Sequence, residues 1–203
     1  TSLPAQPLSP LDGRYRAAVA PLADYLSEAG LNRARVEVEV EWLLALTGRS
    51  LFGTSPLSDD QQIQLRALYR DFGQVEIDWL AEKEAVTRHD VKAVEYLVRD
   101  RLETLGLGAI AELTHFACTS EDINSLAYAL TVKRAVENVW LPKYRGVIAA
   151  LRASATELRD APMLSHTHGQ PATPSTMGKE LAVFVWRLER VSRQVESNEF
   201  LGK

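Results

Sequence analysis

The residues best suited to chemistry lie in a short polar segment, residues 165–174, which reads Ser-His-Thr-His-Gly-Gln-Pro-Ala-Thr-Pro. The segment brings two histidines, His166 and His168, and the amide of Gln170 into a turn with one glycine and two prolines. Imidazole is the side chain that most readily gives and takes protons near neutral pH. Proline restricts φ to one value, and glycine allows φ values that other residues rarely adopt. Such a segment can therefore hold a histidine in one pose between helices. The segment therefore predicts an acid–base site on an interhelical loop.

Two further polar clusters lie where turns or helix starts are predicted. Arg14 and Tyr15 follow an Asp-Gly turn, and arginine offers a planar fork of donors for a phosphate or carboxylate. Arg88, His89 and Asp90 precede an apolar helical pattern, so the histidine is expected beside free backbone N–H groups that favour an anion. The alternatives are a surface turn for the first cluster and an ordinary capping segment for the second.

A fourth cluster consists of Thr119 and Ser120 at the predicted start of a long helix. Hydroxyls and free backbone N–H groups at such a position form a cradle for an anion, and the alternative is simple N-capping. His115, one turn earlier, is predicted to be a packed, hydrogen-bonded histidine rather than a catalyst.

The composition restricts the classes of function. The chain has 203 residues, of which 46% are hydrophobic, so it can form one large domain or two small ones. Its formal net charge of −4 and the lack of a basic stripe give no argument for nucleic-acid binding. The single cysteine cannot form an internal disulfide. No apolar run approaches the ~20 residues that span a bilayer, and residues 1–7 lack the pattern of a secretory signal. We therefore expect a soluble cytoplasmic protein.

Motifs for metals and nucleoside triphosphates are missing from the sequence. It has no cysteine pair, no His-Glu-x-x-His, no acidic calcium loop, no glycine-rich phosphate loop and no nucleophile elbow. The His-x-His pair at 166–168 has no third ligand nearby in the sequence. No metal site and no cofactor are therefore predicted.

The hydrophobic periodicity predicts an all-α fold. Helices are expected at 18–29, ending at Gly30, at 32–47, ending at Gly48, at 59–72 after a capping box, at 74–86, from Thr87 to Leu105, at 109–116, at 121–140, at 143–159 after a hinge at Pro142, and from 175 onward. Within 32–47 the alternation of valine and glutamate also resembles a strand, and we prefer the helix because it continues the flanking pattern.

Four blocks of sequence, at 9–15, 88–96, 115–124 and 167–176, closely resemble the bacterial adenylosuccinate lyases, a family of the fumarase/aspartase superfamily. The blocks occur in the right order and cover almost the whole chain. The resemblance implies a fumarase/aspartase-like helical fold, with a small N-terminal helical domain at 1–110 and the first part of a long-helix bundle at 111–203. It also implies a homotetramer with shared active sites and no cofactor.

The activity implied by the resemblance is the elimination of fumarate from two purine nucleotide intermediates, adenylosuccinate and the succinylcarboxamide ribotide. By similarity, His168 is the general acid and His89 orients the substrate. Arg14 and Tyr15 would hold the phosphate, and Thr119 and Ser120 would hold a succinyl carboxylate. The resemblance also places Arg88, Asp90, Lys92 and Gln170 at or near the same site.

Three departures from the family pattern bear on the function. Arg88 stands where relatives usually have asparagine, and His166 stands where arginine is common. The family's loop with a catalytic serine base is not found in the 203 residues, so we expect the chain alone to be inactive. Two alternatives remain open: another lyase of the superfamily, acting on argininosuccinate or forming fumarate from malate, and a non-catalytic helical assembly module that uses the helices after residue 120.

Overall fold

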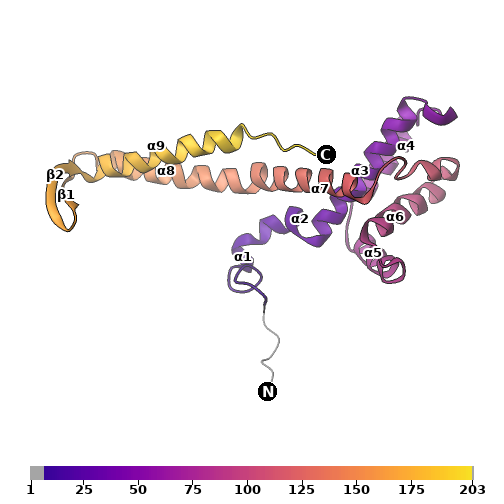
Figure 1. Ribbon diagram of the computed structural model, residues 1–203, viewed down its shortest axis with the longest axis horizontal. Helices are drawn as coiled ribbons and strands as arrows, with labels where there is room; N and C mark the ends of the chain where they lie inside the picture. The colour runs from indigo at the N-terminus through magenta and orange to yellow at the C-terminus, as the bar shows by residue number, and fades with distance from the viewer. Residues whose placement is uncertain (1–6, 203) are drawn as a thin grey trace, which may run out of the picture. The chain divides into compact units, whose positions relative to one another are not determined.

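The computed structural model describes residues 7–202 and is mostly helical (Figure 1), which confirms the predicted fold class. The chain forms two compact units, Thr1–Lys133 with Phe200–Lys203, and Arg134–Glu199. Residues 1–6 and 203 lie outside the described residues. The predicted domain boundary near residue 110 stays a prediction.

The elements follow one another along the chain with short connections. In order they are α1 (Arg16–Val19), η1 (Ala20–Leu22), α2 (Ala23–Leu26), α3 (Glu28–Gly48), η2 (Leu51–Gly53), α4 (Asp59–Arg70), α5 (Gln74–Thr87), α6 (Asp90–Thr104), η3 (Gly108–Leu113), α7 (Ser120–Ala135), η4 (Val136–Trp140), α8 (Leu141–Glu157), β1 (Pro162–Thr167), β2 (Gln170–Thr176) and α9 (Met177–Glu196).

The helix α3 is the centre of the first unit and contacts α4 and α6. Val36, Val40 and Leu43 are fully buried in a core that also includes Leu65 of α4 and Val98 of α6. This packing decides between helix and strand for 32–47 in favour of the helix. The alternation of valine and glutamate does not reflect a strand with one buried face. It occurs in a helix that neighbouring helices cover on several sides.

The predicted helix end at Gly30 is wrong, because Gly30 lies in the first turn of α3. Ser27 is the N-cap, and its hydroxyl accepts a hydrogen bond from the Gly30 N–H at 3.1 Å. A Cβ atom on Gly30 would lie 2.7 Å from the Tyr25 carbonyl oxygen and 2.8 Å from that of Asp24. Glycine is therefore needed at this position for close backbone approach rather than for a left-handed helix end.

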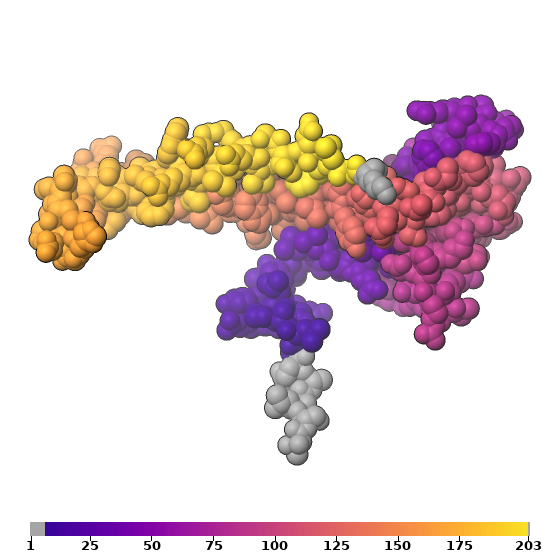
Figure 2. All heavy atoms as spheres, in the orientation of Figure 1, coloured from indigo at the N-terminus to yellow at the C-terminus, as the bar shows by residue number. Residues whose placement is uncertain are grey.

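The second unit is a helical hairpin, in which α8 and α9 run antiparallel and are joined by β1 and β2 (Figure 1). Figure 2 shows the atoms of α8, in salmon to orange, and of α9, in yellow, in contact with each other. The predicted hinge at Pro142 is wrong, because the backbone stays helical through Leu141, with φ −58° and ψ −45°. Pro142 lies in the first turn of α8, where the missing N–H is tolerated, and a π-helical segment, η4, precedes it.

Candidate functional site

The histidine segment forms a β-hairpin, which gives a regular form to the stiff interhelical loop that we expected. Thr167 pairs with Gln170, and the two residues between them, His168 and Gly169, have φ values of 48° and 76°. Two consecutive left-handed residues make a two-residue turn that matches the twist of the strands. The hairpin places His168 at the tip, exposed to solvent and held by a defined turn.

Gln170 is the first residue of β2, and His166 is opposite Pro171 on the neighbouring strand. Both side chains are exposed. The hairpin therefore presents His166, His168 and Gln170 on one short projection of the second unit.

The starts of α6 and α7 meet at a second group of predicted site residues, in the first unit. Here the predicted helix start at Thr87 is wrong: Thr87 ends α5, Arg88 reverses the chain with φ 54°, and His89 caps α6. The Nδ1 atom of His89 accepts a hydrogen bond from the Lys92 N–H at 3.2 Å. In the neutral ring the proton is therefore on Nε2, which lies 3.4 Å from Ser120 Oγ.

Asp90 is tied to a residue that sequence reasoning missed. Its carboxylate accepts a hydrogen bond from the Val91 N–H at 2.8 Å and lies 2.6 Å from the Arg35 guanidinium. Burial raises the pKa of Asp90, but the Val91 N–H and Arg35 outweigh it, so the pKa is lowered overall. No signal in the sequence singles out Arg35, because it is one of several charged residues in the predicted helix 32–47.

The Thr119 cradle is partly occupied by the chain itself. The Asp122 carboxylate accepts hydrogen bonds from the Thr119 N–H at 2.8 Å and from its hydroxyl at 3.0 Å. The backbone N–H of Thr119 is thus engaged, whereas the hydroxyl of the adjacent Ser120 faces His89.

The loop before α7 is held in a strained conformation by α3. His115 and Ala117 have φ values of 62° and 60°, which non-glycine residues rarely adopt. Glu39, whose side chain is fully buried, accepts the His115 N–H at 3.1 Å and lies 2.5 Å from its Nδ1. The indole N–H of Trp42 donates to the Phe116 carbonyl at 2.8 Å. His115 is therefore a hydrogen-bonded, largely buried histidine, as predicted.

Burial raises the pKa of Glu39, and its contacts with His115 offset only part of this increase. The pKa of the nearby Cys118 thiol is raised as well, by burial first and then by Glu39 and Asp122. Burial therefore favours the uncharged forms of these two groups, Glu39 on α3 and Cys118 in the loop before α7.

Arg14 and Tyr15 lie together near the start of the described chain. The Arg14 guanidinium is 4.9 Å from the centre of the Tyr15 ring. Asp12 stabilises the turn before them by accepting hydrogen bonds from Ser9 and Leu8, which lower the pKa of Asp12. Among residues 7–202, no hydrogen bond or ion pair joins this turn to His89.

The structure thus brings together His89, Asp90 and Ser120, with Thr119 beside them. His168 and Gln170 are in the other unit. In the described part of the chain, no three His, Cys, Asp or Glu side chains are grouped closely enough to hold a metal ion. Within residues 7–202, no helix is long and apolar enough to cross a membrane.

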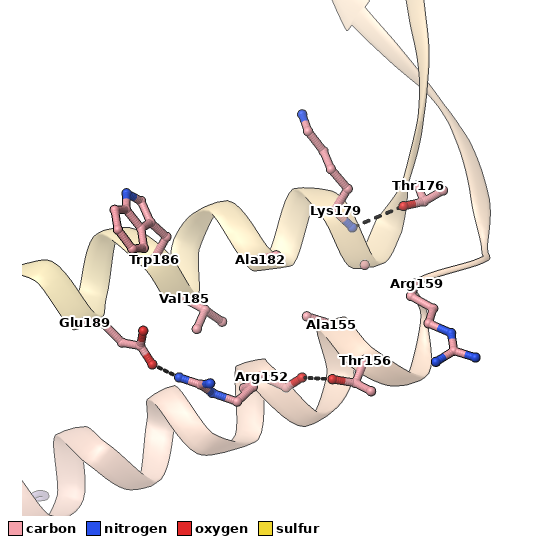
Figure 3. Close-up of a pocket in the computed structure, with 11 residues that line it drawn as sticks. Arg152, Ala155, Thr156, Arg159, Thr176, Lys179, Ala182, Val185, Trp186 and Glu189 are labelled. Atoms are coloured by element: carbon pink, nitrogen blue, oxygen red, sulfur yellow. Dashed lines mark hydrogen bonds and ion pairs between the residues drawn. The ribbon is translucent and has the colours of Figure 1, made fainter.

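A pocket of about 550 Å³ lies between α8 and α9 in the second unit (Figure 3). Its cations are Arg152, Arg159 and Lys179. Each one already has a carboxylate partner, namely Glu189, Asp160 and Glu180. We therefore assign no anion site to this pocket.

Comparison with known proteins decides the family. The family model described as Lyase matches residues 13–199. The chain belongs to the lyase family. It is 43% identical over 198 residues to adenylosuccinate lyase of Haemophilus influenzae, and 44% identical to that of Escherichia coli K12. Each match covers 97% of this chain and 43% of the relative, so this lyase-family chain spans less than half the length of these proteins.

Solved structures support the fold. A fumarate lyase from Mesorhizobium sp. BNC1 superimposes with a TM-score of 0.69 at 22% identity, over 87% of this chain and 39% of that one. A 3-carboxy-cis,cis-muconate lactonizing enzyme from Pseudomonas putida gives 0.67 at 18% identity, over 87% and 39%. The predicted fumarase/aspartase-like helical fold is therefore confirmed.

Proposed function

We propose that this lyase-family chain forms part of an adenylosuccinate lyase, which eliminates fumarate from adenylosuccinate to leave AMP, and from the succinylcarboxamide ribotide. Its 43–44% identity to adenylosuccinate lyases over nearly the whole chain supports this assignment. One structural observation carries the proposal. The starts of α6 and α7 converge so that His89 Nε2 lies 3.4 Å from Ser120 Oγ, and helix starts favour the carboxylates and phosphate of this substrate.

The reaction needs a base and an acid. A base removes a proton from the carbon next to a substrate carboxylate, the C–N bond breaks, and its electron pair stays on the departing nitrogen. An acid then protonates that nitrogen. We assign this acid to His168, because imidazole is the side chain that most readily gives and takes protons near neutral pH. The base is expected from a serine loop that these 203 residues do not contain.

The remaining predicted residues would bind the substrate. Ser120, with Thr119, would hold a succinyl carboxylate, and Nε2–H of His89 would donate to the same part of the substrate. Arg14 and Tyr15 would hold the phosphate, since arginine provides a fork of donors. Arg88, Asp90, Lys92 and Gln170 would complete the lining. No cofactor is part of this proposal.

We also propose that the protein is a cytoplasmic homotetramer. The second unit exposes large apolar side chains that a helical hairpin by itself cannot bury. Val147, Phe184 and Trp186 are each more than half exposed. Such faces usually pack against other helices or subunits. The same exposed faces favour the second candidate, a non-catalytic helical assembly module.

The test uses substrate binding and turnover. Adenylosuccinate is titrated into the purified chain by isothermal calorimetry, with argininosuccinate and malate as comparison ligands. Selective binding of adenylosuccinate supports the proposal. Binding of another ligand favours a different lyase, and self-association without binding favours the assembly module.

Turnover is tested in a chimera, in which this chain replaces the matching 43% of the Escherichia coli enzyme. Fumarate release is expected from the chimera and should be lost in His168→Ala. His166→Ala is the matched control, because it removes an exposed histidine from the same hairpin. Equal loss in both variants would contradict the role given to His168.

A further inference from the structure

One buried arginine of α3 connects the starts of α6 and α7. The Arg35 side chain is 6% exposed. Its Nη2 lies 2.6 Å from Asp90 Oδ2, and its Nε donates to Asn124 Oδ1 at 2.9 Å. Its Nη1 donates to Asn32 Oδ1 on α3 itself, at 2.8 Å. All three nitrogens of the guanidinium therefore make contacts within the first unit.

The two outer contacts lie next to the candidate site. Asp90 follows His89 directly, and Asn124 is one helical turn after Ser120. His89 and Ser120 are 31 positions apart in the chain, and their side chains meet at 3.4 Å. Arg35 thus fixes the spacing of the two helix starts that bring these side chains together.

Arg35 also controls the charge beside the site. Asp90 Oδ1 lies 3.6 Å from His89 Nδ1. If Asp90 were unpaired, its carboxylate would repel an anionic ligand bound at His89 and Ser120. The guanidinium, itself 6% exposed, neutralises this charge at 2.6 Å, while the Asp90 side chain is 44% exposed.

We propose that Arg35 is a positioning residue for the His89–Ser120 site, and that it holds both helix starts without touching the substrate. The identity of the ligand rests on the proposed function. The role of Arg35 in shaping the site rests on the geometry alone. Lysine cannot replace arginine fully, because an ammonium group lacks the rigid fork that reaches Asp90 and Asn124 together.

The experiment compares three variants of the 203-residue chain. Arg35→Met removes the fork and keeps the apolar stem. Arg35→Lys keeps the charge. Arg66→Met is the matched control, because Arg66 also joins α3 to another helix, through Glu41 at 2.7 and 3.0 Å, but has no contact with the site.

Three quantities are measured for each variant. They are adenylosuccinate affinity by calorimetry, the nuclear Overhauser contact between the His89 ring and the Ser120 side chain, and stability in urea. Arg35→Met should lose the contact and bind at least about tenfold more weakly. Arg35→Lys should recover part of the affinity, since it keeps the charge next to Asp90. Arg66→Met should lose stability and keep both site properties.

An Arg35→Met variant that keeps both the contact and the affinity would overturn the proposal. If the unsubstituted chain does not bind adenylosuccinate and the chimera releases no fumarate, the proposed function fails, and the His89–Ser120 contact still decides the role of Arg35. If Arg35→Met does not fold, Asn124→Ala removes one arm of the fork only. An unchanged contact in that variant would also overturn the proposal.

Discussion

The fully buried carboxylate of Glu39 lies 2.5 Å from Nδ1 of His115, a residue with a left-handed backbone. The same carboxylate accepts the His115 backbone N–H at 3.1 Å. One side chain of α3 therefore holds both the backbone and the ring of a strained residue, four positions before Thr119. Strained conformations persist only where the surroundings impose them, and here the buried acid does so.

Replacement of Glu39 should destabilise the first unit. Glu39→Ala leaves the His115 N–H without its acceptor and opens a cavity, which should lower the free energy of unfolding by about 3 kcal/mol. Glu39→Gln keeps the shape and one acceptor oxygen, so a loss of about 1 kcal/mol is expected. Urea denaturation followed by circular dichroism measures both. Equal losses for alanine and glutamine would show that the hydrogen bonds to His115 contribute little.

The raised pKa of Glu39 predicts a pH dependence of stability. Because burial raises the pKa in the folded state, the folded chain binds this proton more readily than the unfolded chain. The stabilising contribution is fully present below the unfolded pKa and is lost as pH rises through the folded pKa. The stability advantage of the unsubstituted chain over Glu39→Gln should therefore shrink as pH rises above 4.5. An advantage that grows over this range would contradict the assignment.

The lowered pKa of Asp90 predicts the opposite dependence. Its stabilising contribution is present above the unfolded pKa, near 3.8, and is lost as pH falls through the folded pKa. Because the side chain is 44% exposed, solvent screening should keep this contribution below about 1 kcal/mol. Acid titrations of the unsubstituted chain and of Asp90→Asn should converge at low pH. Parallel curves would show that Asp90 is not perturbed by folding.

Gly30→Ala should be strongly destabilising for a steric reason. The new methyl carbon would lie 2.7 Å from the Tyr25 carbonyl oxygen, and backbone cannot move aside as a flexible side chain can. A loss of about 2 kcal/mol is expected. Gly48→Ala is the control, since a Cβ atom there meets nothing within 4 Å and the residue is helical. That variant should be neutral or more stable by about 0.5 kcal/mol. Thermal unfolding of Gly30→Ala and Gly48→Ala measures the change in stability of each variant.

Gly169→Ala should loosen the turn that presents His168. Gly169 has a φ of 76°, a value that costs a residue with a side chain about 1 kcal/mol. The stability of α8 and α9 should change little, whereas hydrogen exchange at the amides of β1 and β2 should accelerate. Fumarate release by the chimera should fall at the same time. Unchanged exchange would show that the strands, rather than the turn, determine the position of His168.

The sequence alone determined the helical class, most helix positions and the family. Those features depend on local periodicity, caps such as the box at Ser58 and Gln61, and contiguous motifs, all of which can be read along the chain. Its errors were at Gly30, Thr87 and Pro142. At each of these positions the local sequence allows more than one backbone conformation at similar energy. A contact with a distant residue, or the conformation of a neighbouring turn, decides which one forms.

Only the tertiary structure revealed the residues that support the site. Arg35 and Glu39 look like ordinary members of a set of charged residues along α3. Their roles depend on Asp90, Asn124 and His115, which lie 55 to 89 positions away. Buried charges are stable only when they are paired, so packing had to bring these partners together. Local pattern thus specified which side chains could do chemistry, and the folded first unit decided which of them, His89 and Ser120, meet.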